Sequence, residues 1–358
     1  MAPPNVKYLS SIGRPGRKPE AFAPFSRAAK ADIARRVSND VNRAVGILRT
    51  GGLVAFPTET VYGLGADARN EAAVRRIFAV KGRPASHPLI VHLASAAEFQ
   101  TWARSVPAVA YELAGRFWPG PLTLILKRSA SVSDLITGGQ DTVGLRVPMN
   151  SLAQQLLQAF AGGIAAPSAN RYGRVSPTSA EDVRADLGDL VDLILDGGPC
   201  EIGVESTIVD LSSGSPALLR PGGISAEDLE GVLGQPMSSE RGSEVRAPGM
   251  QAAHYAPRAR IVLADASSLA SVAERERGSG HSVVVLAPGT PALSSGIEQI
   301  RVPETLGEYA RVLYRTLREV DRRQFDVAVV QIQPLSGLGL AIRDRLTRAA
   351  AAKLDQQP

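Results

Sequence analysis

The sequence predicts an α/β protein whose first domain is built on a mixed sheet and is followed by a smaller domain with a parallel sheet. Many short apolar runs, each bounded by proline or glycine, are interspersed with stretches whose apolar residues recur at helical spacing. Several of these runs follow each other with no helix between them, which favours a mixed sheet in the first domain. A chain of 358 residues is too long for one ordinary core, so we expect two domains.

The first domain is predicted over residues 36–234. The apolar positions from Val41 to Leu48 have helical spacing, Leu53–Phe56 has the character of a buried strand, and Glu71–Val80 is an amphipathic helix. Short apolar runs predict further strands at Leu89–Leu93, Leu122–Leu126, Val143–Val147, Gly163–Ala166, Leu193–Leu195, Ser206–Val209 and Ala217–Leu219. Helical spacing predicts further helices at Ala96–Ala103, Val106–Phe117, Leu152–Phe160, Ser179–Leu187 and Ala226–Leu233.

Residues 235–258 are rich in proline, glycine and serine, and such a long stretch is typical of a linker or a functional loop. Strands and helices then alternate over a second domain, predicted at residues 259–352. The expected order is Arg260–Leu263 (strand), Ser268–Glu274 (helix), Ser282–Leu286 (strand), Tyr309–Val320 (helix), Val327–Ile332 (strand) and Leu340–Ala350 (helix). This alternation is typical of a small three-layer domain with a largely parallel sheet.

The basic character of the chain, with a pI of about 9.5, comes from its N-terminal end. Residues 1–30 contain six lysines and arginines and one glutamate, and their net charge of +5 equals that of the whole chain, so the remainder is neutral. We expect residues 1–35 to form a disordered basic tail, and the neutral body gives no support for a duplex-binding face. The single cysteine, Cys200, excludes an internal disulfide and suits a reducing, cytoplasmic location.

The region from Gly51 to His92 carries the strongest functional signal. Thr58, Glu59, Thr60 and Tyr62 follow a proline at the end of a buried strand, where open sheets place their ligand sites. Lys81 and Arg83 flank a glycine just beyond a predicted helix, and an anion is a natural third partner for two cations held so close. A polar helix cap and a solvated basic helix end are the structural alternatives, and each motif taken alone is compatible with them.

His87 and His92 bracket a short predicted strand. The two histidines are five residues apart, so their side chains lie on opposite faces of an extended chain. This arrangement argues against a shared metal ion. The sequence contains no His-Glu-x-x-His motif, so we also exclude a zinc hydrolase, and the site prediction includes no protein-bound metal. Each histidine could bind a ligand or belong to the core.

Other predicted strand ends repeat the same pattern of small hydroxyl residues accompanied by an arginine. Ser168 and Asn170 follow one strand, Ser206 and Thr207 open another, and Thr142, Ser176, Arg146 and Arg220 lie beside such ends, although Ser176 could simply begin a helix. A site rich in cations and hydroxyls but poor in nucleophiles fits nucleotidyl transfer by positioning and electrostatics, with the substrates supplying the nucleophile.

Two other nucleotide-binding motifs are not supported. Gly337-Leu338-Gly339 precedes a helix but lacks the third glycine of a dinucleotide-binding loop. The sequence also has no Gly-x-x-x-x-Gly-Lys-[Ser/Thr] motif, so ATP would not be bound by a P-loop.

The ordered set of motifs closely resembles the threonylcarbamoyl-AMP synthase family in its long, two-domain form. The matching segments are Phe-Pro-Thr-Glu-Thr-Val-Tyr-Gly-Leu-Gly, Lys-Gly-Arg-Pro-x-x-His-Pro-Leu-Ile-Val-His, Gly-Leu-Arg-Val-Pro, Pro-Ser-Ala-Asn, Ser-Thr-Ile-Val-Asp and Arg-Pro-Gly. The resemblance covers roughly residues 38–350. It implies a YrdC-like catalytic domain, with a twisted mixed sheet and helices around a concave cavity, and a small Rossmann-like parallel α/β domain.

The resemblance also implies the reaction and its partners. L-threonine, bicarbonate and ATP, with Mg²⁺ assisting, would give threonylcarbamoyl-AMP and pyrophosphate. The product would pass to a tRNA threonylcarbamoyl transferase complex for N6-threonylcarbamoyladenosine synthesis, without stable tRNA binding by this chain and without a membrane.

The resemblance also implies roles for the residues of this chain that match the family's motifs. Threonine would be held by Thr60, His92, Arg146, Ala166 and Ser206, with Arg146 on its carboxylate. ATP would be surrounded by Lys81, Arg83, His87, Thr142, Ser168, Asn170, Ser176, Arg220 and Tyr255, with Lys81 and Arg83 stabilising the leaving pyrophosphate. Tyr255 belongs to His254-Tyr255-Ala256-Pro257, which resembles the family's linker segment and predicts a lid over the nucleotide. The chain departs from the family at Asn170-Arg171-Tyr172-Gly173-Arg174, where a smaller turn containing serine and glycine is usual.

Two other functions remain as alternatives. One is a non-catalytic RNA-binding or translation-associated module on the same fold, which the basic tail would favour. The other is a carbamoyl-phosphate-using transferase of related fold, which the absence of accessory zinc-finger cysteines argues against.

Overall fold

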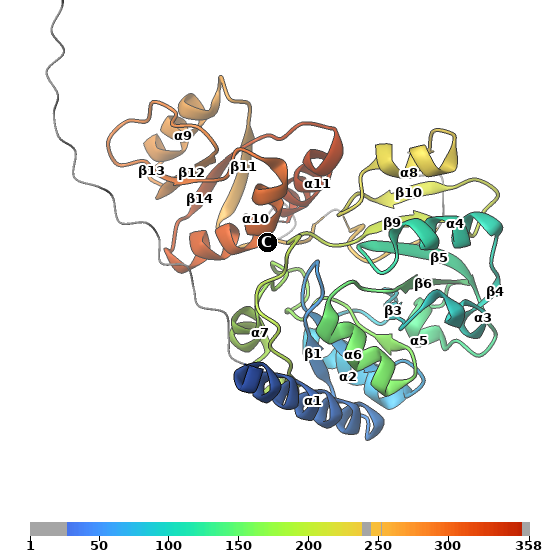
Figure 1. Cartoon of the computed structure of the whole chain (residues 1–358). Coiled ribbons are helices and arrows are strands. Elements are labelled where there is room, and N and C mark those ends of the chain that lie inside the picture. Colours follow the sequence, from blue (N-terminus) through green and yellow to red (C-terminus); the bar gives the residue numbers. More distant parts are fainter. Residues whose placement is uncertain (1–26, 238–244, 252, 353–358) are drawn as a thin grey trace, which may run out of the picture. The chain divides into compact units, whose positions relative to one another are not determined.

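The computed structural model describes residues 27–237, 245–251 and 253–352, with side chains from residue 37 onward (Figure 1). Of the described residues, those up to Ser38 belong to a unit separate from those that begin at Asn39. Helix α1 spans Arg27–Arg49, and its Val41, Ala44, Val45 and Leu48 are buried. Most of the predicted N-terminal tail lies outside the described residues, but the helix begins within the range 1–35 that we assigned to it.

The first domain is built on a mixed 10-stranded sheet in the order β10-β9-β5-β6-β3-β7-β2-β1-β8, with β4 paired to β5. Strands β3 and β6 are parallel, as are β5 and β9 and also β1 and β8, whereas the other pairs are antiparallel. The strands are β1 (Val54–Phe56), β2 (Gly63–Asp67), β3 (Ile90–His92), β4 (Ala103–Ser105), β5 (Leu122–Arg128), β6 (Thr142–Arg146), β7 (Ile164–Ala165), β8 (Leu193–Ile194), β9 (Thr207–Asp210) and β10 (Ala217–Arg220).

Helices pack their apolar stripes against this sheet, and several begin at a side-chain cap. In α2 (Glu71–Lys81), Asn70 accepts a hydrogen bond from the N–H of Ala73, and Gly82 ends the helix at a positive φ of 66°. The other helices of this domain are α3 (Phe99–Trp102), α4 (Ala108–Phe117), α5 (Asp134–Thr137), α6 (Ser151–Phe160), α7 (Ala180–Leu187) and α8 (Ala226–Leu233). One contiguous core joins α2, α3, α4 and α7 to the sheet.

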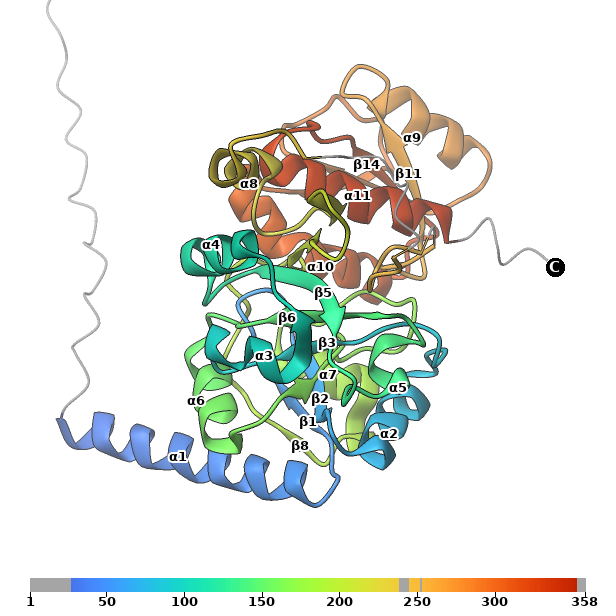
Figure 2. The ribbon, with the colours of Figure 1, turned by 90° about the vertical axis from the view of Figure 1, so that its right-hand side faces the viewer.

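The second domain contains four parallel strands in the order β11-β14-β12-β13. Its core is divided by the sheet: Leu269 and Ala273 of α9 pack on one face, and residues of α10 and α11 pack on the other. Figures 1 and 2 show α10 and α11 on the side of the first domain. The elements are β11 (Arg260–Ala264), α9 (Leu269–Gly278), β12 (Val283–Ala287), β13 (Glu298–Arg301), α10 (Leu306–Arg322), β14 (Val327–Gln331) and α11 (Gly337–Ala351).

The structure confirms the predicted fold class, a mixed-sheet α/β domain followed by a parallel α/β domain. It also contains elements that the sequence did not indicate, namely β2, β4, β13 and α5. Strand β2 reads Gly-Leu-Gly-Ala-Asp, and glycine and aspartate are depleted in strands. The predicted helix Ala96–Ala103 was wrong in part, because a 3-10 turn and the short α3 give way to β4 at Ala103.

Candidate functional site

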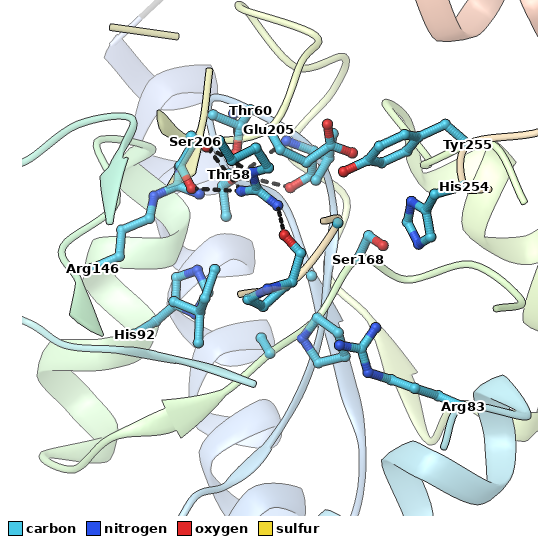
Figure 3. Close-up of a pocket in the computed structure, with 18 residues that line it drawn as sticks. Thr58, Thr60, Arg83, His92, Arg146, Ser168, Glu205, Ser206, His254 and Tyr255 are labelled. Atoms are coloured by element: carbon cyan, nitrogen blue, oxygen red, sulfur yellow. Dashed lines mark hydrogen bonds between the residues drawn. The ribbon is translucent and has the colours of Figure 1, made fainter. Parts of the chain in front are cut away.

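A small cavity lies beside the ends of the central strands of the large sheet (Figure 3). Its volume is about 50 Å³. Its walls are formed by Thr58, Thr60, Val61, Gly63, Arg83, Ile90, His92, Arg146, Ala166, Pro167, Ser168, Glu205, Ser206, Arg220, Pro248, Gly249, His254 and Tyr255. These residues come from seven separate stretches of the first domain and from the linker, so folding is what brings them together.

All five residues predicted to hold threonine line this cavity, namely Thr60, His92, Arg146, Ala166 and Ser206. His92 and Arg146 end the adjacent parallel strands β3 and β6, where they are register partners. Thr60 belongs to a tight turn in which the Thr58 hydroxyl accepts hydrogen bonds from the N–H groups of Thr60 and Val61, at 3.1 and 3.2 Å. The threonine set therefore forms one continuous part of the wall.

Arg146 is oriented by a carboxylate that belongs to the same site. Its Nη2 donates to Oε1 of Glu59 at 2.6 Å, and both side chains are buried. The other oxygen of Glu59 accepts the N–H of Met149 at 2.9 Å, and Arg146 Nε donates to the carbonyl of Gly120 at 3.3 Å. One edge of the guanidinium is therefore already engaged, which leaves Nη1 to receive a ligand carboxylate.

His92 is held in its neutral form. Burial, with added repulsion from Arg146, lowers the pKa of His92 to about 3. Its ring lies edge-on to Phe56, with ring centroids 5.8 Å apart, and its Nδ1 has no hydrogen-bond partner among the described residues. A neutral imidazole with an open ring nitrogen can exchange a hydrogen bond with a ligand hydroxyl or amine.

Ser206 is fixed between two strands by Arg220. The Arg220 Nη2 donates to the Ser206 hydroxyl at 3.0 Å and to its carbonyl at 2.9 Å, while Thr123 exchanges a hydrogen bond with the same hydroxyl at 2.8 Å. Gly222 permits this close packing, because a Cβ there would lie 2.3 Å from the Glu205 carbonyl oxygen. The glycine of the Arg-Pro-Gly motif thus has a steric role.

Four of the residues predicted to surround ATP also line the cavity, namely Arg83, Ser168, Arg220 and Tyr255. In Figure 3, Arg146 and His92 lie at one end, and Arg83, His254 and Tyr255 lie at the other. Burial lowers the pKa of Arg83 to about 10, and repulsion from Arg220 contributes, but at this value Arg83 is still charged at neutral pH. Desolvated cations that repel each other favour the binding of an anion between them.

The remaining residues of the predicted ATP set do not line the cavity. Lys81 Nζ donates to the carbonyls of Ser168 and Asn170, at 2.5 and 2.6 Å, and Ser176 donates to Glu205 at 2.7 Å. The Asn170 amide donates to the carbonyls of Arg171 and Arg174 within its own loop. Thr142 is buried at the start of β6, and His87 is 3.2 Å from the Tyr172 hydroxyl. Several of these residues shape the segments that do line the cavity.

The linker closes the end of the cavity at which Arg83, His254 and Tyr255 lie. Arg220 Nη1 donates to the Pro248 carbonyl at 2.8 Å, and Ala247 and Met250 pack with Ile90, Ile125 and Ile208 of the sheet. Gly249 has a φ of +81°, and a Cβ at this position would lie 2.2 Å from the Tyr255 hydroxyl. The resulting volume of about 50 Å³ is far below the roughly 300–1,000 Å³ of typical ligand pockets.

Sequence reasoning assigned no role to the lining residues Glu205, Pro248 and Gly249, and it placed Thr58 at the strand end without a role in binding. It also did not identify Glu59, which is not a lining residue, as the partner of Arg146. A detectable signal existed for the two glutamates, because each stands next to small hydroxyl residues in a segment otherwise expected to be buried. Four lining residues carry buried polar atoms without a hydrogen-bond partner among the described residues: Arg83, His92, His254 and Tyr255. Such atoms are rare in folded proteins, and a ligand or water normally satisfies them.

Among residues 27–237, 245–251 and 253–352, no group of three or more His, Cys, Asp or Glu side chains is placed to hold a metal ion. The same part of the chain contains no helix long and apolar enough to cross a membrane.

Comparison with known proteins matches both domains to family models. Residues 46–222 match the model described as "Telomere recombination" (Sua5_yciO_yrdC), and residues 224–351 match "Threonylcarbamoyl-AMP synthase, C-terminal domain". The chain is 42% identical to a threonylcarbamoyl-AMP synthase of Pyrococcus abyssi, over 87% of this chain and 94% of that protein. It is 39% identical to the corresponding protein of Bacillus subtilis, over 88% and 94%.

A solved structure shows the same fold. The crystal structure of P. abyssi Sua5 complexed with L-threonine superposes with a TM-score of 0.82 at 41% identity, and covers 88% of this chain and 95% of that chain. The match therefore extends over both domains. With both family models matched and the residues expected for threonine gathered in one cavity, this chain belongs to the threonylcarbamoyl-AMP synthase family.

Proposed function

We propose that this protein is an L-threonylcarbamoyladenylate synthase, a nucleotidyltransferase that converts L-threonine, bicarbonate and ATP into threonylcarbamoyl-AMP and pyrophosphate. The observation that supports this most directly is the polarity of the cavity. One end carries the neutral His92 and the Arg146 suited to an amino acid, and the other carries Arg83, a buried cation suited to a phosphate. Arg220, bonded to Ser206 and to the Pro248 carbonyl, adds a second buried cation to the same cavity.

In the proposed reaction, the threonine amine attacks CO2 derived from bicarbonate and loses a proton, which gives a carbamate. A carbamate oxygen then attacks the α-phosphorus of ATP, and the bond to the pyrophosphate oxygen breaks. Arg146 would hold the threonine carboxylate through Nη1, and Arg83 would stabilise charge on the departing pyrophosphate. Positioning supplies the rest of the catalysis, since no protein nucleophile is required.

Lys81 has a less direct part in this proposal than the sequence suggested. Burial, followed by repulsion from Arg83, lowers the pKa of Lys81 well below its ordinary value, and its three-donor head is engaged with two carbonyls. We propose that Lys81 positions the loop Ser168–Asn170, and that a direct contact with the triphosphate requires this loop to rearrange.

We propose that Mg²⁺ enters with ATP and is held by its phosphates and by water, which is a common mode for this ion. The described residues do not form a protein-held site, because Glu205, the carboxylate in the cavity wall near Arg220, is already bonded to Ser176 and Arg345. Chelation with EDTA is therefore expected to stop pyrophosphate release and excess Mg²⁺ to restore it. Undiminished release after exhaustive chelation would count against a role for the ion.

We further propose that the linker, residues 235–258, is a lid. The cavity beneath it is too small for ATP while Pro248 and Gly249 occupy their observed places, so this part of the linker must move for ATP to enter. We also retain three proposals from the sequence: a cytoplasmic location, transfer of the labile product to a tRNA threonylcarbamoyl transferase complex, and no stable tRNA binding by this chain.

The test of the function is pyrophosphate release from ATP by the purified full-length protein. Release is expected only when L-threonine and bicarbonate are both present, and the adenylate should be detectable by mass spectrometry. L-serine and L-valine, each sharing part of the threonine side chain, serve as matched controls for the amino-acid end. Release that is independent of threonine, or no release with all substrates present, would refute the proposal, and the latter would favour a binding module.

A further inference from the structure

Glu205 lies in the cavity wall, but groups of the C-terminal domain hold its carboxylate. Arg345 Nε of α11 donates to Glu205 Oε2 at 2.6 Å, and the Tyr314 hydroxyl of α10 donates to the same oxygen at 2.7 Å. On the other oxygen, Ser176 of the catalytic domain donates at 2.7 Å. Arg345 is completely buried and Glu205 is 6% exposed.

This carboxylate is charged. Burial alone would raise the pKa of Glu205, but the charges of Arg345 and Arg220 outweigh burial and lower it to about 2. A carboxylate that is ionised at neutral pH therefore stands in a cavity whose proposed ligand is a polyanion. Without a compensating cation, it would repel a triphosphate strongly, because charges interact more strongly in a poorly hydrated site than in water.

Arg345 also contacts the linker residue predicted to cover the nucleotide. Its guanidinium lies 5.1 Å from the ring centroid of Tyr255, which stacks on Tyr314 at 5.8 Å. Tyr255 adopts a positive φ of 60°, an uncommon conformation for a tyrosine that its surroundings must maintain. One residue of the C-terminal domain thus touches both the acidic wall and the lid.

The remaining contacts of α11 strengthen this link. Arg348 Nη1 donates to the Gln251 carbonyl at 2.6 Å, and the Arg348 carbonyl accepts the N–H of His254 at 3.3 Å. Asp344 accepts hydrogen bonds from both Arg345 and Arg348. A hydrophobic pair could supply equal or greater stability at such a position, so stability alone does not require the ion pair between Glu205 and Arg345.

We propose that Arg345 is a positioning residue for the nucleotide: it neutralises Glu205 and supports Tyr255, and through them the C-terminal domain makes the cavity able to accept a triphosphate. This inference rests on the proposed function. It gives the C-terminal domain a direct part in ATP recognition, while threonine recognition stays with the catalytic domain.

The experiment compares four full-length variants with the wild type: Arg345→Met, Glu205→Gln, the double variant, and Arg343→Met. Arg343 belongs to the same helix and does not contact Glu205 in any described interaction, so its variant controls for the loss of one positive charge. KM values for ATP and for threonine come from pyrophosphate release. Calorimetry with the non-hydrolysable analogue AMPCPP gives nucleotide affinity without turnover, and circular dichroism monitors folding.

Arg345→Met is expected to weaken AMPCPP binding and to raise the KM for ATP about 100-fold, with the KM for threonine changed by less than about threefold. The double variant should recover most of this loss, because the uncompensated carboxylate is gone. Glu205→Gln alone should bind AMPCPP at least as well as the wild type. Arg343→Met should match the wild type.

Three results would overturn the inference. The first is an equal loss of ATP and threonine affinity in Arg345→Met, the second is no recovery in the double variant, and the third is a tenfold or greater loss of nucleotide affinity in Glu205→Gln. If Arg345→Met does not fold, Glu205→Gln and the double variant still decide the question. A wild type that binds AMPCPP but releases no pyrophosphate would refute the proposed reaction, and calorimetry would still judge the inference.

Discussion

At the scale of single residues, the site is organised by paired and unpaired charges. Arg146 is paired with Glu59 and Arg345 with Glu205, whereas Arg83 uses Nη2 on the Pro88 carbonyl and leaves Nε without a partner among the described residues. Arg146 and Arg83 line the cavity, whereas Arg345 is not among the lining residues. The unpartnered Nε of Arg83 is therefore the arginine donor best placed to meet a phosphate.

The Arg83→Ala substitution is expected to slow pyrophosphate formation by about 10²–10³-fold, because it removes a charge-assisted donor from a desolvated site. Steady-state kcat/KM for ATP checks this, with the exposed Arg116→Ala as the control. A rate within threefold of the wild type would remove Arg83 from the catalytic machinery.

The lowered pKa of His254 predicts how the stability of the fold depends on pH. Burial, with repulsion from Arg83, Lys81 and Arg220, lowers its pKa to about 3, while Glu205 acts in the opposite direction. A folded-state pKa below the unfolded value of about 6.5 means that the unfolded chain binds the proton first. This histidine's contribution to stability is therefore complete above pH 6.5 and is lost progressively as the pH falls towards 3.

Below pH 6.5, His92 and His254 should each reduce the free energy of unfolding by about 1.4 kcal/mol per pH unit. Urea unfolding of wild type and His254→Gln at pH 7, 6 and 5 tests this, because the variant should lose the contribution of one histidine to the slope. In the range from pH 7 to pH 5, Glu205 does not contribute to the slope, because its contribution to stability is lost only below its unfolded pKa of about 4.5. Identical slopes would show that His254 is not held neutral.

At the scale of elements, the linker is the segment that gives the cavity its final size. Gly249 makes this possible, since its positive φ and the contact of a Cβ with the Tyr255 hydroxyl both exclude a side chain. Its role differs from that of Gly231 in α8, where an added Cβ would meet no heavy atom within 4 Å.

Gly249→Ala is expected to favour the open linker and to weaken its closure over ATP that has already entered, which raises the KM for ATP about tenfold, while Gly231→Ala leaves it unchanged. Limited proteolysis gives a second readout. Cleavage near residues 240–250 should slow when threonine and ATP are added to the wild type, and slow less in Gly249→Ala. Equal protection in both proteins would contradict a lid that depends on this glycine.

The sequence predicted elements well where one periodicity dominated, as in α2, α6 and the strands β11, β12 and β14. It missed β2 because glycines occupy its interior, where the adjacent Phe56 and Ile164 side chains leave no room for a Cβ at Gly65. It identified Arg146 and Ser206 from their place at strand ends. It did not identify Glu59 as the partner of Arg146, because that contact joins residues 87 positions apart and no local pattern records it.

Lys81 illustrates a further limit of local patterns. The spacing of Lys81 and Arg83 indicated that both side chains bind the same anion, but the two side chains differ in what they contact. Lys81 turns to the carbonyls of Ser168 and Asn170, and Arg83 lines the cavity. The position of the Ser168–Asn170 loop, which is distant in the sequence, determines that the two side chains have different roles. A local sequence pattern does not contain this position.

At the scale of the whole molecule, the two domains share a hydrophobic core. Val61, Val175 and Val204 of the first domain pack in one cluster with Tyr255 and with residues of α10 and α11. Arg318 of α10 reinforces this junction, with Nη1 and Nη2 on the two carboxylate oxygens of Asp186 at 3.0 and 2.7 Å and a further bond to the Val175 carbonyl.

Removing this arginine should weaken the junction specifically. Arg318→Ala is expected to lower the free energy of unfolding by about 1–3 kcal/mol, because Asp186 and the Val175 carbonyl lose a charged donor. Calorimetry should show a lower transition temperature, or a transition that separates into two. The control is Arg315→Ala, which changes an exposed position on the same helix. If both variants lowered the free energy of unfolding equally, the loss would come from α10 itself and not from the junction between the domains.

Ala247 and Met250 of the linker make an apolar contact with Ile90, Ile125 and Ile208. This contact makes the closure of the linker depend on temperature. Lifting the linker exposes these side chains to water, so the closed form is favoured by a hydrophobic contribution that diminishes on cooling. Closure should therefore lower the heat capacity of the protein, and the population of open molecules should grow as the temperature falls. On cooling, the linker of this chain should therefore open at temperatures at which the sheet beneath it is still folded.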